Sequence, residues 1–224
     1  MTKQEVRARI EQIGIIPSIR VSSKEDAQFA AEAVSSGGIP IVEITMTVPG
    51  AIDLISNLVK HAPDMVVGAG SVWDTEMAHR CMNAGAAFIT TEGFDSHVVE
   101  LAVKGNTVVF PGALTPTEVI KAWQVGSDFV KVFPCAQVGG DSYIRALTAP
   151  LRDVRLIAAG GVNQQTAANF ILAGAVAIGV GVDLIPRDSI RLRQSERIRE
   201  LARRFMGFVE SARAELASRK IKPT

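Results

Sequence analysis

The chain has 224 residues, of which 47% are hydrophobic and 21% are charged, and its formal net charge is +1. This length predicts a single α/β domain over residues 1–224, and the small net charge argues against nucleic acid or a membrane surface as a partner. No uncharged apolar stretch reaches about 18 residues, so we expect no membrane span. Two cysteines and a charged N-terminal segment unlike a signal peptide favour the cytoplasm.

Short β-branched runs alternate with longer amphipathic runs along the chain. The short runs are almost continuously apolar, as in parallel strands that are buried on both faces of a sheet. They predict eight strands, over residues 15–20, 39–45, 65–70, 87–90, 107–110, 129–132, 155–159 and 175–180.

The amphipathic runs predict helices, since Ser, Thr, Asp or Pro stands near several of their starts and Gly at most of their ends. These runs are 23–36, 49–62, 74–84, 92–105, 115–126 and 163–174. A further helix is predicted at the N-terminus, within residues 1–14. The long charged segment 191–218 predicts an outer helix whose inward residues are Leu192, Ile198, Leu201, Phe205 and Phe208, followed by a frayed tail over 219–224.

Eight parallel strands with helical crossovers can close into a barrel or remain an open, doubly wound sheet. The count of eight, and the lack of a Gly-x-Gly-x-x-Gly sequence after the first strand, favour closure. We therefore predict a (β/α)8 TIM barrel with an extra N-terminal helix and a long C-terminal helix. An active site is then expected at the carboxyl ends of the strands.

Two charged residues of opposite sign interrupt these apolar strands. Burial of Lys131 would lower its pKa, and a neutral amine is a nucleophile that condenses with ketones. Glu43 could move protons as a general acid or base. The structural alternative is that each charge is simply paired inside the barrel, Lys131 with a carboxylate and Glu43 with Lys131 or Arg20.

Other strand ends carry groups that could bind an anion. Arg20 could form a forked contact with a carboxylate or phosphate, unless it pairs with Glu43. Gly160-Gly161 precedes a predicted helix, and its backbone N–H groups, with those near Gly181, could hold a phosphate. A Gly-Gly pair is also ordinary turn chemistry. All three histidines fall on predicted helices, so we expect no metal and no cofactor.

Five short motifs, taken together and in this order, resemble the KDPG/KHG aldolase family. They are VEIT at 42–45, VGAGSV at 67–72, FPG at 110–112, KVFP at 131–134 and GGVN at 160–163, and the resemblance extends from about residue 13 to 186. Members of this family are class I pyruvate aldolases that act on 2-keto-3-deoxy-6-phosphogluconate or 4-hydroxy-2-oxoglutarate. The resemblance implies a homotrimer of barrels and a small 2-keto acid as substrate.

The resemblance also implies roles for individual residues. Lys131 would form a Schiff base with pyruvate, and Glu43, acting with a water, would be the general acid and base. Arg20 and Ser71 would hold the carboxylate and hydroxyl groups of the substrate, and Phe133 would pack against the pyruvate unit. The phosphate would lie at Gly160, Gly161 and Gly181, and the remaining predicted substrate-binding residues are Thr45, Pro111 and Glu92.

The chain departs from the family pattern at both ends of the expected pocket. Thr47 stands where some members carry Arg, and Glu92 falls where Ser-Pro is expected. At the phosphate end two hydroxyl groups are missing, because Ala159 and Val182 replace hydroxyl residues, and Asp183 adds a negative charge. We therefore expect weak activity on the phosphorylated six-carbon substrate and better relative activity on smaller or non-phosphorylated 2-keto acids.

Two other functions remain open from the sequence. The same barrel could be an isomerase or epimerase for a phosphorylated sugar, which would not need a Schiff base. It could also be a degenerate, non-catalytic barrel, a possibility kept open by Glu92, Val182 and Asp183.

Overall fold

The structure, a computed structural model, describes residues 1–221 and contains one parallel β-sheet that closes into a barrel. Neighbouring strands follow the order β5-β4-β3-β2-β1-β9-β8-β7-β6. The strands are β1 (Ile15–Ile19), β2 (Ile41–Thr45), β3 (Val66–Gly70), β4 (Phe88–Thr90), β5 (Val108–Phe110), β6 (Gly112–Ala113), β7 (Val130–Val132), β8 (Leu156–Ala159) and β9 (Ala177–Val180). The predicted barrel is confirmed.

Closure of the barrel depends on the segment around Pro111. The strands at the two ends of the sheet, β5 and β6, are separated in sequence by Pro111 alone, so they are two halves of one strand, of which the predicted range 107–110 covers only the first half. Proline has no N–H to donate to a strand ladder, and this accounts for the break. The carbonyl of Pro111 still accepts a 2.9 Å hydrogen bond from the N–H of Lys131, which joins the fifth strand to β7.

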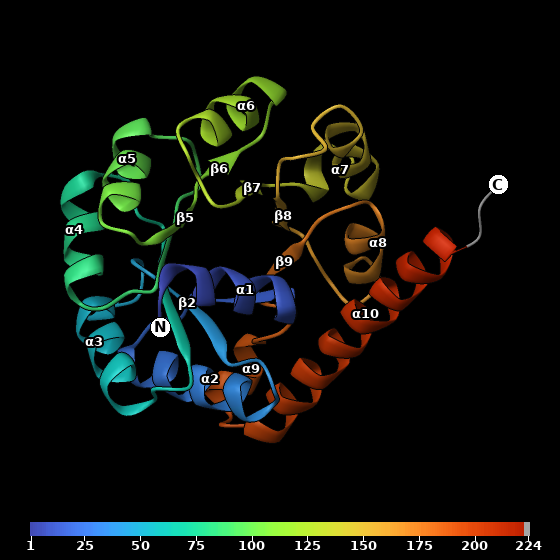
Figure 1. The fold of residues 1–224 in the computed structure, drawn as a ribbon. Helices are drawn as coiled ribbons and strands as arrows, with labels where there is room; N and C mark the ends of the chain where they lie inside the picture. The colour runs from blue at the N-terminus through green and yellow to red at the C-terminus, as the bar shows by residue number, and fades with distance from the viewer. Residues whose placement is uncertain (222–224) are drawn as a thin grey trace.

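Helices surround the strands on the outside of the barrel (Figure 1). Capping side chains start several of them where the sequence predicts, as at Ser23, Asp74 and Thr115, each of which accepts a backbone N–H three residues on. The helices are α1 (Lys3–Ile13), α2 (Lys24–Ser36), α3 (Ala51–His61), α4 (Thr75–Asn83), α5 (Ser96–Lys104), α6 (Pro116–Gln124), α7 (Asp141–Thr148), α8 (Ala167–Leu172), α9 (Arg187–Arg191) and α10 (Ser195–Ile221), with a 3-10 turn at Ala136–Val138.

The first helix closes the amino-terminal mouth of the barrel. Val6 and Ile10 of α1 are buried against the barrel, and Lys3 forms a 3.0 Å ion pair with Asp128, which lies just before β7. Glu11 forms a second 3.0 Å ion pair with Arg155, just before β8. Because α1 covers this end, the opposite end, where the strands finish, is the one that remains available for a site.

The long C-terminal helix α10 lies along the outside of the barrel and packs against α2 and α8 (Figure 1). Of its predicted inward residues, Ile198 and Phe205 are fully buried, and Leu201 and Phe208 are partly buried. The prediction for Leu192 is wrong: this side chain is 53% exposed, because it caps the separate short helix α9. The chain turns at Arg193, whose φ is 52°, so α10 begins only at Ser195.

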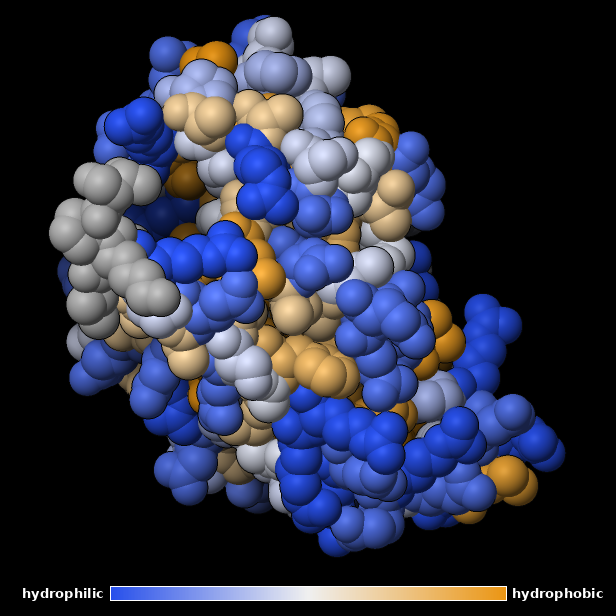
Figure 2. Space-filling model, turned by 90° about the vertical axis from the view of Figure 1, so that its right-hand side faces the viewer, coloured by the Kyte–Doolittle hydropathy of each residue, from blue (hydrophilic) through white to orange (hydrophobic). Residues whose placement is uncertain are grey.

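The predicted frayed tail 219–224 falls partly within α10, which continues to Ile221, and residues 222–224 lie outside the described part of the chain. Figure 2 shows the side of the molecule reached by the end of α10, covered mainly by hydrophilic side chains with hydrophobic ones in small groups. Within residues 1–221 no helix is both long enough and apolar enough to cross a membrane.

Candidate active site

A cavity of about 370 Å³ opens at the carboxyl ends of the strands. Eight of the eleven residues predicted for the site line this cavity, and they come from β2, β7 and the loops that follow β1, β4, β7, β8 and β9. These eight are Arg20, Glu43, Glu92, Lys131, Phe133, Gly160, Gly161 and Gly181.

The other three predicted residues do not line the cavity. Thr45 is fully buried and donates a 3.0 Å hydrogen bond to the carbonyl of Ile19. Pro111 contributes through its backbone, as described above, and Ser71 lies behind Glu92, to which it donates a hydrogen bond of 2.8 Å. Ser71 is therefore linked to the cavity through Glu92 and Pro111 through the backbone of Lys131, whereas Thr45 joins β2 to β1.

Lys131 lies at the centre of β7, and its side chain points into the barrel. The residue is 6% exposed, and within residues 1–221 it forms no ion pair with a carboxylate. Burial away from water lowers the pKa of Lys131, although the nearby charges of Glu43 and Glu92 oppose this and raise it. The Nζ atom lies 5.4 Å from the centre of the Phe133 ring. This environment favours the neutral, nucleophilic amine over the structural ion pair.

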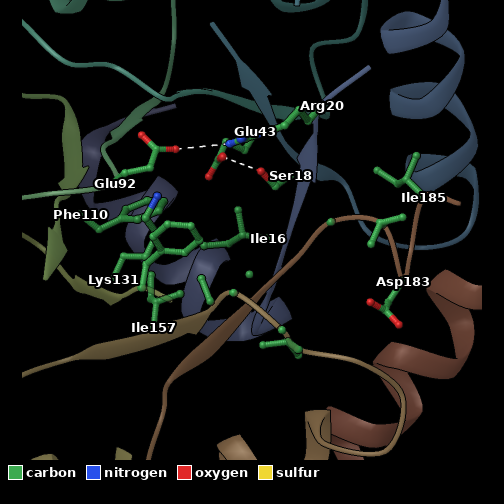
Figure 3. A pocket seen from close by; sticks show the side chains of 18 of the residues that line it. Ile16, Ser18, Arg20, Glu43, Glu92, Phe110, Lys131, Ile157, Asp183 and Ile185 are labelled. Carbon is green, nitrogen blue, oxygen red and sulfur yellow. Dashed lines mark hydrogen bonds and ion pairs between the residues drawn. The ribbon is translucent and has the colours of Figure 1, made fainter. Parts of the chain in front are cut away.

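Glu43 projects from β2 into the same cavity and is 5% exposed. Its Oε1 atom accepts a 2.7 Å hydrogen bond from the hydroxyl of Ser18 on β1, the neighbouring strand. Room for the carboxylate comes from Gly70 on β3, since a Cβ atom at this position would overlap the Glu43 side chain. The carboxylate is thus held at a fixed place near the amine of Lys131 (Figure 3).

Arg20 does not pair with Glu43, as one alternative supposed. Its Nη2 atom lies 3.4 Å from Oε1 of Glu92 and 3.2 Å from the hydroxyl of Ser71. Trp73 donates a further 3.3 Å hydrogen bond from Nε1 to Oε2 of Glu92. Three donors therefore converge on one carboxylate at the end of the cavity next to Lys131.

The two glycines after β8 form the other end of the cavity. Gly160 and Gly161 have φ values of 85° and 82°, in the left-handed region that favours glycine. A Cβ atom on Gly160 would lie 2.8 Å from the Cα atom of Pro134, so only glycine fits here without a shift of the backbone. Asp183 lies at this end, across the cavity from Lys131 (Figure 3).

Comparison with known proteins connects this arrangement to a family. A family profile described as KDPG and KHG aldolase matches residues 6–201. The chain belongs to the KDPG and KHG aldolase family. The family membership that the five motifs predicted is therefore confirmed.

Individual relatives in this family match nearly the whole chain. The KHG/KDPG aldolase of Escherichia coli K12 is 29% identical over 84% of this chain and 89% of its own length. A 2-dehydro-3-deoxy-phosphogluconate aldolase of Treponema pallidum is 28% identical, over 89% and 95%. A crystal structure of the KDPG aldolase of Legionella pneumophila, with pyruvate captured as a covalent carbinolamine, superposes with a TM-score of 0.82 at 28% identity, over 88% and 96%.

Two polar residues of this aldolase cavity were missed by the sequence analysis. Ser18 was overlooked because it lies in the middle of a predicted strand, although residues two apart in a strand face the same side and Arg20 was already predicted for the site. Arg187 is the first residue of the short helix α9, which follows β9, and it also lines the cavity. The sequence could have indicated this residue through its position just after the last strand, where a TIM barrel often binds phosphate.

The described residues 1–221 contain no group of three or more His, Cys, Asp or Glu side chains arranged to hold a metal ion. His61, His79 and His97 lie on the outer helices α3, α4 and α5.

Proposed function

We propose that this chain is a class I aldolase that cleaves a 4-hydroxy-2-keto acid to pyruvate and an aldehyde, with Lys131 as the Schiff-base amine. The observation that carries the proposal is the buried amine of Lys131, which has a lowered pKa and faces Glu43 in a cavity at the carboxyl ends of the strands. Among residues 1–221 it has no ion-pair partner. Membership of the aldolase family supports the same reaction.

The neutral amine attacks the C2 ketone of the substrate, and loss of water leaves an iminium ion on Lys131. Glu43, directly or through a water, removes the proton from the C4 hydroxyl group. The C3–C4 bond then breaks, its electron pair moves into the iminium as an enamine, and the aldehyde leaves. Protonation at C3 and hydrolysis of the iminium return pyruvate and the free amine. The Ser18 hydrogen bond keeps the Glu43 carboxylate in place for both proton transfers.

The direct test is release of pyruvate from a panel of 4-hydroxy-2-keto acids, measured for the wild type and for Lys131→Met. We expect cleavage by the wild type and loss of at least a thousandfold in kcat/KM by the variant. Activity that survives Lys131→Met would indicate a phosphosugar isomerase or epimerase, and no cleavage of any substrate by the wild type would indicate a non-catalytic barrel.

At the far end of the cavity we propose that a phosphate group is bound less well than the family pattern would suggest. Ala159 and Val182 carry no hydroxyl group, and Val182 is 60% exposed. Arg187 also lines the cavity and carries the charge opposite to that of Asp183, so the proposal depends on the missing hydroxyl groups. Comparison of kcat/KM for phosphorylated and non-phosphorylated 2-keto acids tests it, and a strong preference for the phosphorylated substrate would contradict it.

We further propose that the aldolase is a cytoplasmic homotrimer, a state implied by its family. Light scattering coupled to size exclusion should then give three times the 23.9 kDa mass of the chain. A mass equal to one chain would contradict this part of the proposal.

A further inference from the structure

The carboxylate of Glu92 accepts hydrogen bonds from the side-chain donors at the end of the cavity nearest to Lys131. Oε1 accepts hydrogen bonds from Ser71 at 2.8 Å and from Arg20 at 3.4 Å, and Oε2 accepts one from Trp73 at 3.3 Å. Arg20 also donates to Ser71 at 3.2 Å, so the donors and the carboxylate form one connected network. A guanidinium, a hydroxyl and an indole N–H together make a site suited to a carboxylate.

This network lies beside the reacting amine. Glu92 and Arg20 both line the cavity that contains Lys131, and Figure 3 shows the Glu92 carboxylate next to the Lys131 amine. The charge of Glu92 reaches the amine, since it is one of the groups that raise the pKa of Lys131 against the larger effect of burial. When a 2-oxo compound is bound to Lys131, its C1 group is therefore close enough to feel the negative charge of Glu92.

The resident carboxylate has opposite effects on two kinds of substrate. A substrate carboxylate at C1 would have to displace Glu92 from its donors or share Arg20 with it, and two carboxylates at one place disfavour each other. An uncharged group meets no such repulsion, and its N–H or O–H can donate to Glu92. Because Glu92 is only partly buried, water screens this repulsion without removing it.

We propose that Glu92 is a specificity-determining residue that weakens the binding of a C1 carboxylate at the Arg20–Ser71–Trp73 donors and favours 2-oxo compounds whose C1 group is uncharged and donates hydrogen bonds. This inference rests on the proposed Schiff base at Lys131. The 2-oxo compounds that react with Lys131 would then include, besides pyruvate, compounds whose C1 group is uncharged.

The test compares two compounds of nearly the same shape, pyruvate and its uncharged amide, pyruvamide. The concentration of each that gives half-maximal borohydride trapping on Lys131 is measured for the wild type, for Glu92→Gln and for Glu100→Gln. Glu100 is an exposed carboxylate on α5 and serves as the matched control. The ratio of the two concentrations cancels any change in the pKa of Lys131, because both compounds react with the same amine.

We expect Glu92→Gln to shift the ratio at least tenfold in favour of pyruvate, and Glu100→Gln to leave it within twofold of the wild type. Glu92→Ala, which removes the side chain beyond Cβ, should shift the ratio in the same direction. It provides a second variant if Glu92→Gln does not fold. An unchanged ratio in either folded Glu92 variant, with trapping on Lys131 intact, would overturn the inference about Glu92 alone. Absence of any adduct in the wild type would overturn the Schiff base itself and this inference with it.

Discussion

The side chain of Lys131 makes the fold less stable than it could be. A buried amine loses its hydration, and in the described part of the chain the nearby charges of Glu43 and Glu92 offset this loss only in part, without an ion pair. Met has nearly the same length and volume and no charge, so it should fill the same space between β7 and the cavity. Stability and activity therefore oppose each other at this position.

Lys131→Met should raise the free energy of unfolding near neutral pH by about 1–3 kcal/mol, the cost of burying a polar group without a partner. The folded-state pKa is lowered, so the unfolded chain binds a proton that the folded chain gives up, and the gain should shrink as the pH rises toward the ordinary lysine pKa of about 10.4. Urea unfolding at several pH values measures this. Lys121→Met, at an exposed position of α6, is the control and should change little. A less stable Lys131→Met at neutral pH would contradict the account.

Glu43→Gln should separate proton transfer from capture of the substrate. The amide keeps the shape of the side chain but cannot accept the proton, so kcat should fall by about 10²–10⁴-fold. Trapping of pyruvate should persist, and its pH dependence should move to lower pH, because the variant loses a charge that raises the pKa of Lys131. Glu210→Gln, on the exposed face of α10, is the matched control. A kcat within threefold of the wild type would remove Glu43 from the mechanism.

At the scale of elements, the contact between α2 and α10 depends on a glycine at the end of α2. A Cβ atom on Gly37 would lie 2.6 Å from Cβ of Ala202 and 3.0 Å from the backbone of Arg199. The long outer helix can therefore approach α2 closely only because Gly37 has no side chain. The second glycine of interest is Gly207 within α10: a Cβ atom added there would have no atom of residues 1–221 within 4 Å apart from its own helix backbone and chain neighbours.

These two glycines predict opposite effects of the same substitution. Gly37→Ala should destabilise the protein by about 1–3 kcal/mol, because the backbone of α10 would have to move. Gly207→Ala should stabilise it by about 0.5–1 kcal/mol, the gain expected for alanine over glycine inside a helix. Thermal unfolding of the two variants measures both. Equal shifts of the same sign would mean that α10 does not pack on α2 as described.

Much of the fold follows from the sequence at this scale, because buried parallel strands are apolar runs and helix caps are local signals. The unpredicted helix α7 has neither signal: it follows Gly139-Gly140, has no side-chain cap and buries only Ile144 and Leu147. The exposure of Leu192 was missed because the left-handed turn at Arg193 has no glycine to mark it. Sequence patterns therefore predict the elements that carry cap and apolar signals, and they miss the helix and the turn that carry neither.

At the scale of the whole molecule, the barrel brings together groups that are far apart in the chain. Lys131 and Glu43 were predicted from their own strands, but the partners of Arg20 and Glu92 were not, since these residues meet only when β1 and the loop after β4 end at the same mouth. Closure of the opposite mouth by α1 leaves this one as the place for chemistry.

The central claim is that the amine of Lys131 captures the ketone of the substrate. Reduction with borohydride in the presence of pyruvate, followed by mass spectrometry of the proteolytic peptides, tests it most directly. The account predicts one reduced pyruvate adduct, on the peptide that contains Lys131, and no adduct in Lys131→Met. An adduct on another lysine, or none in the wild type, would contradict it.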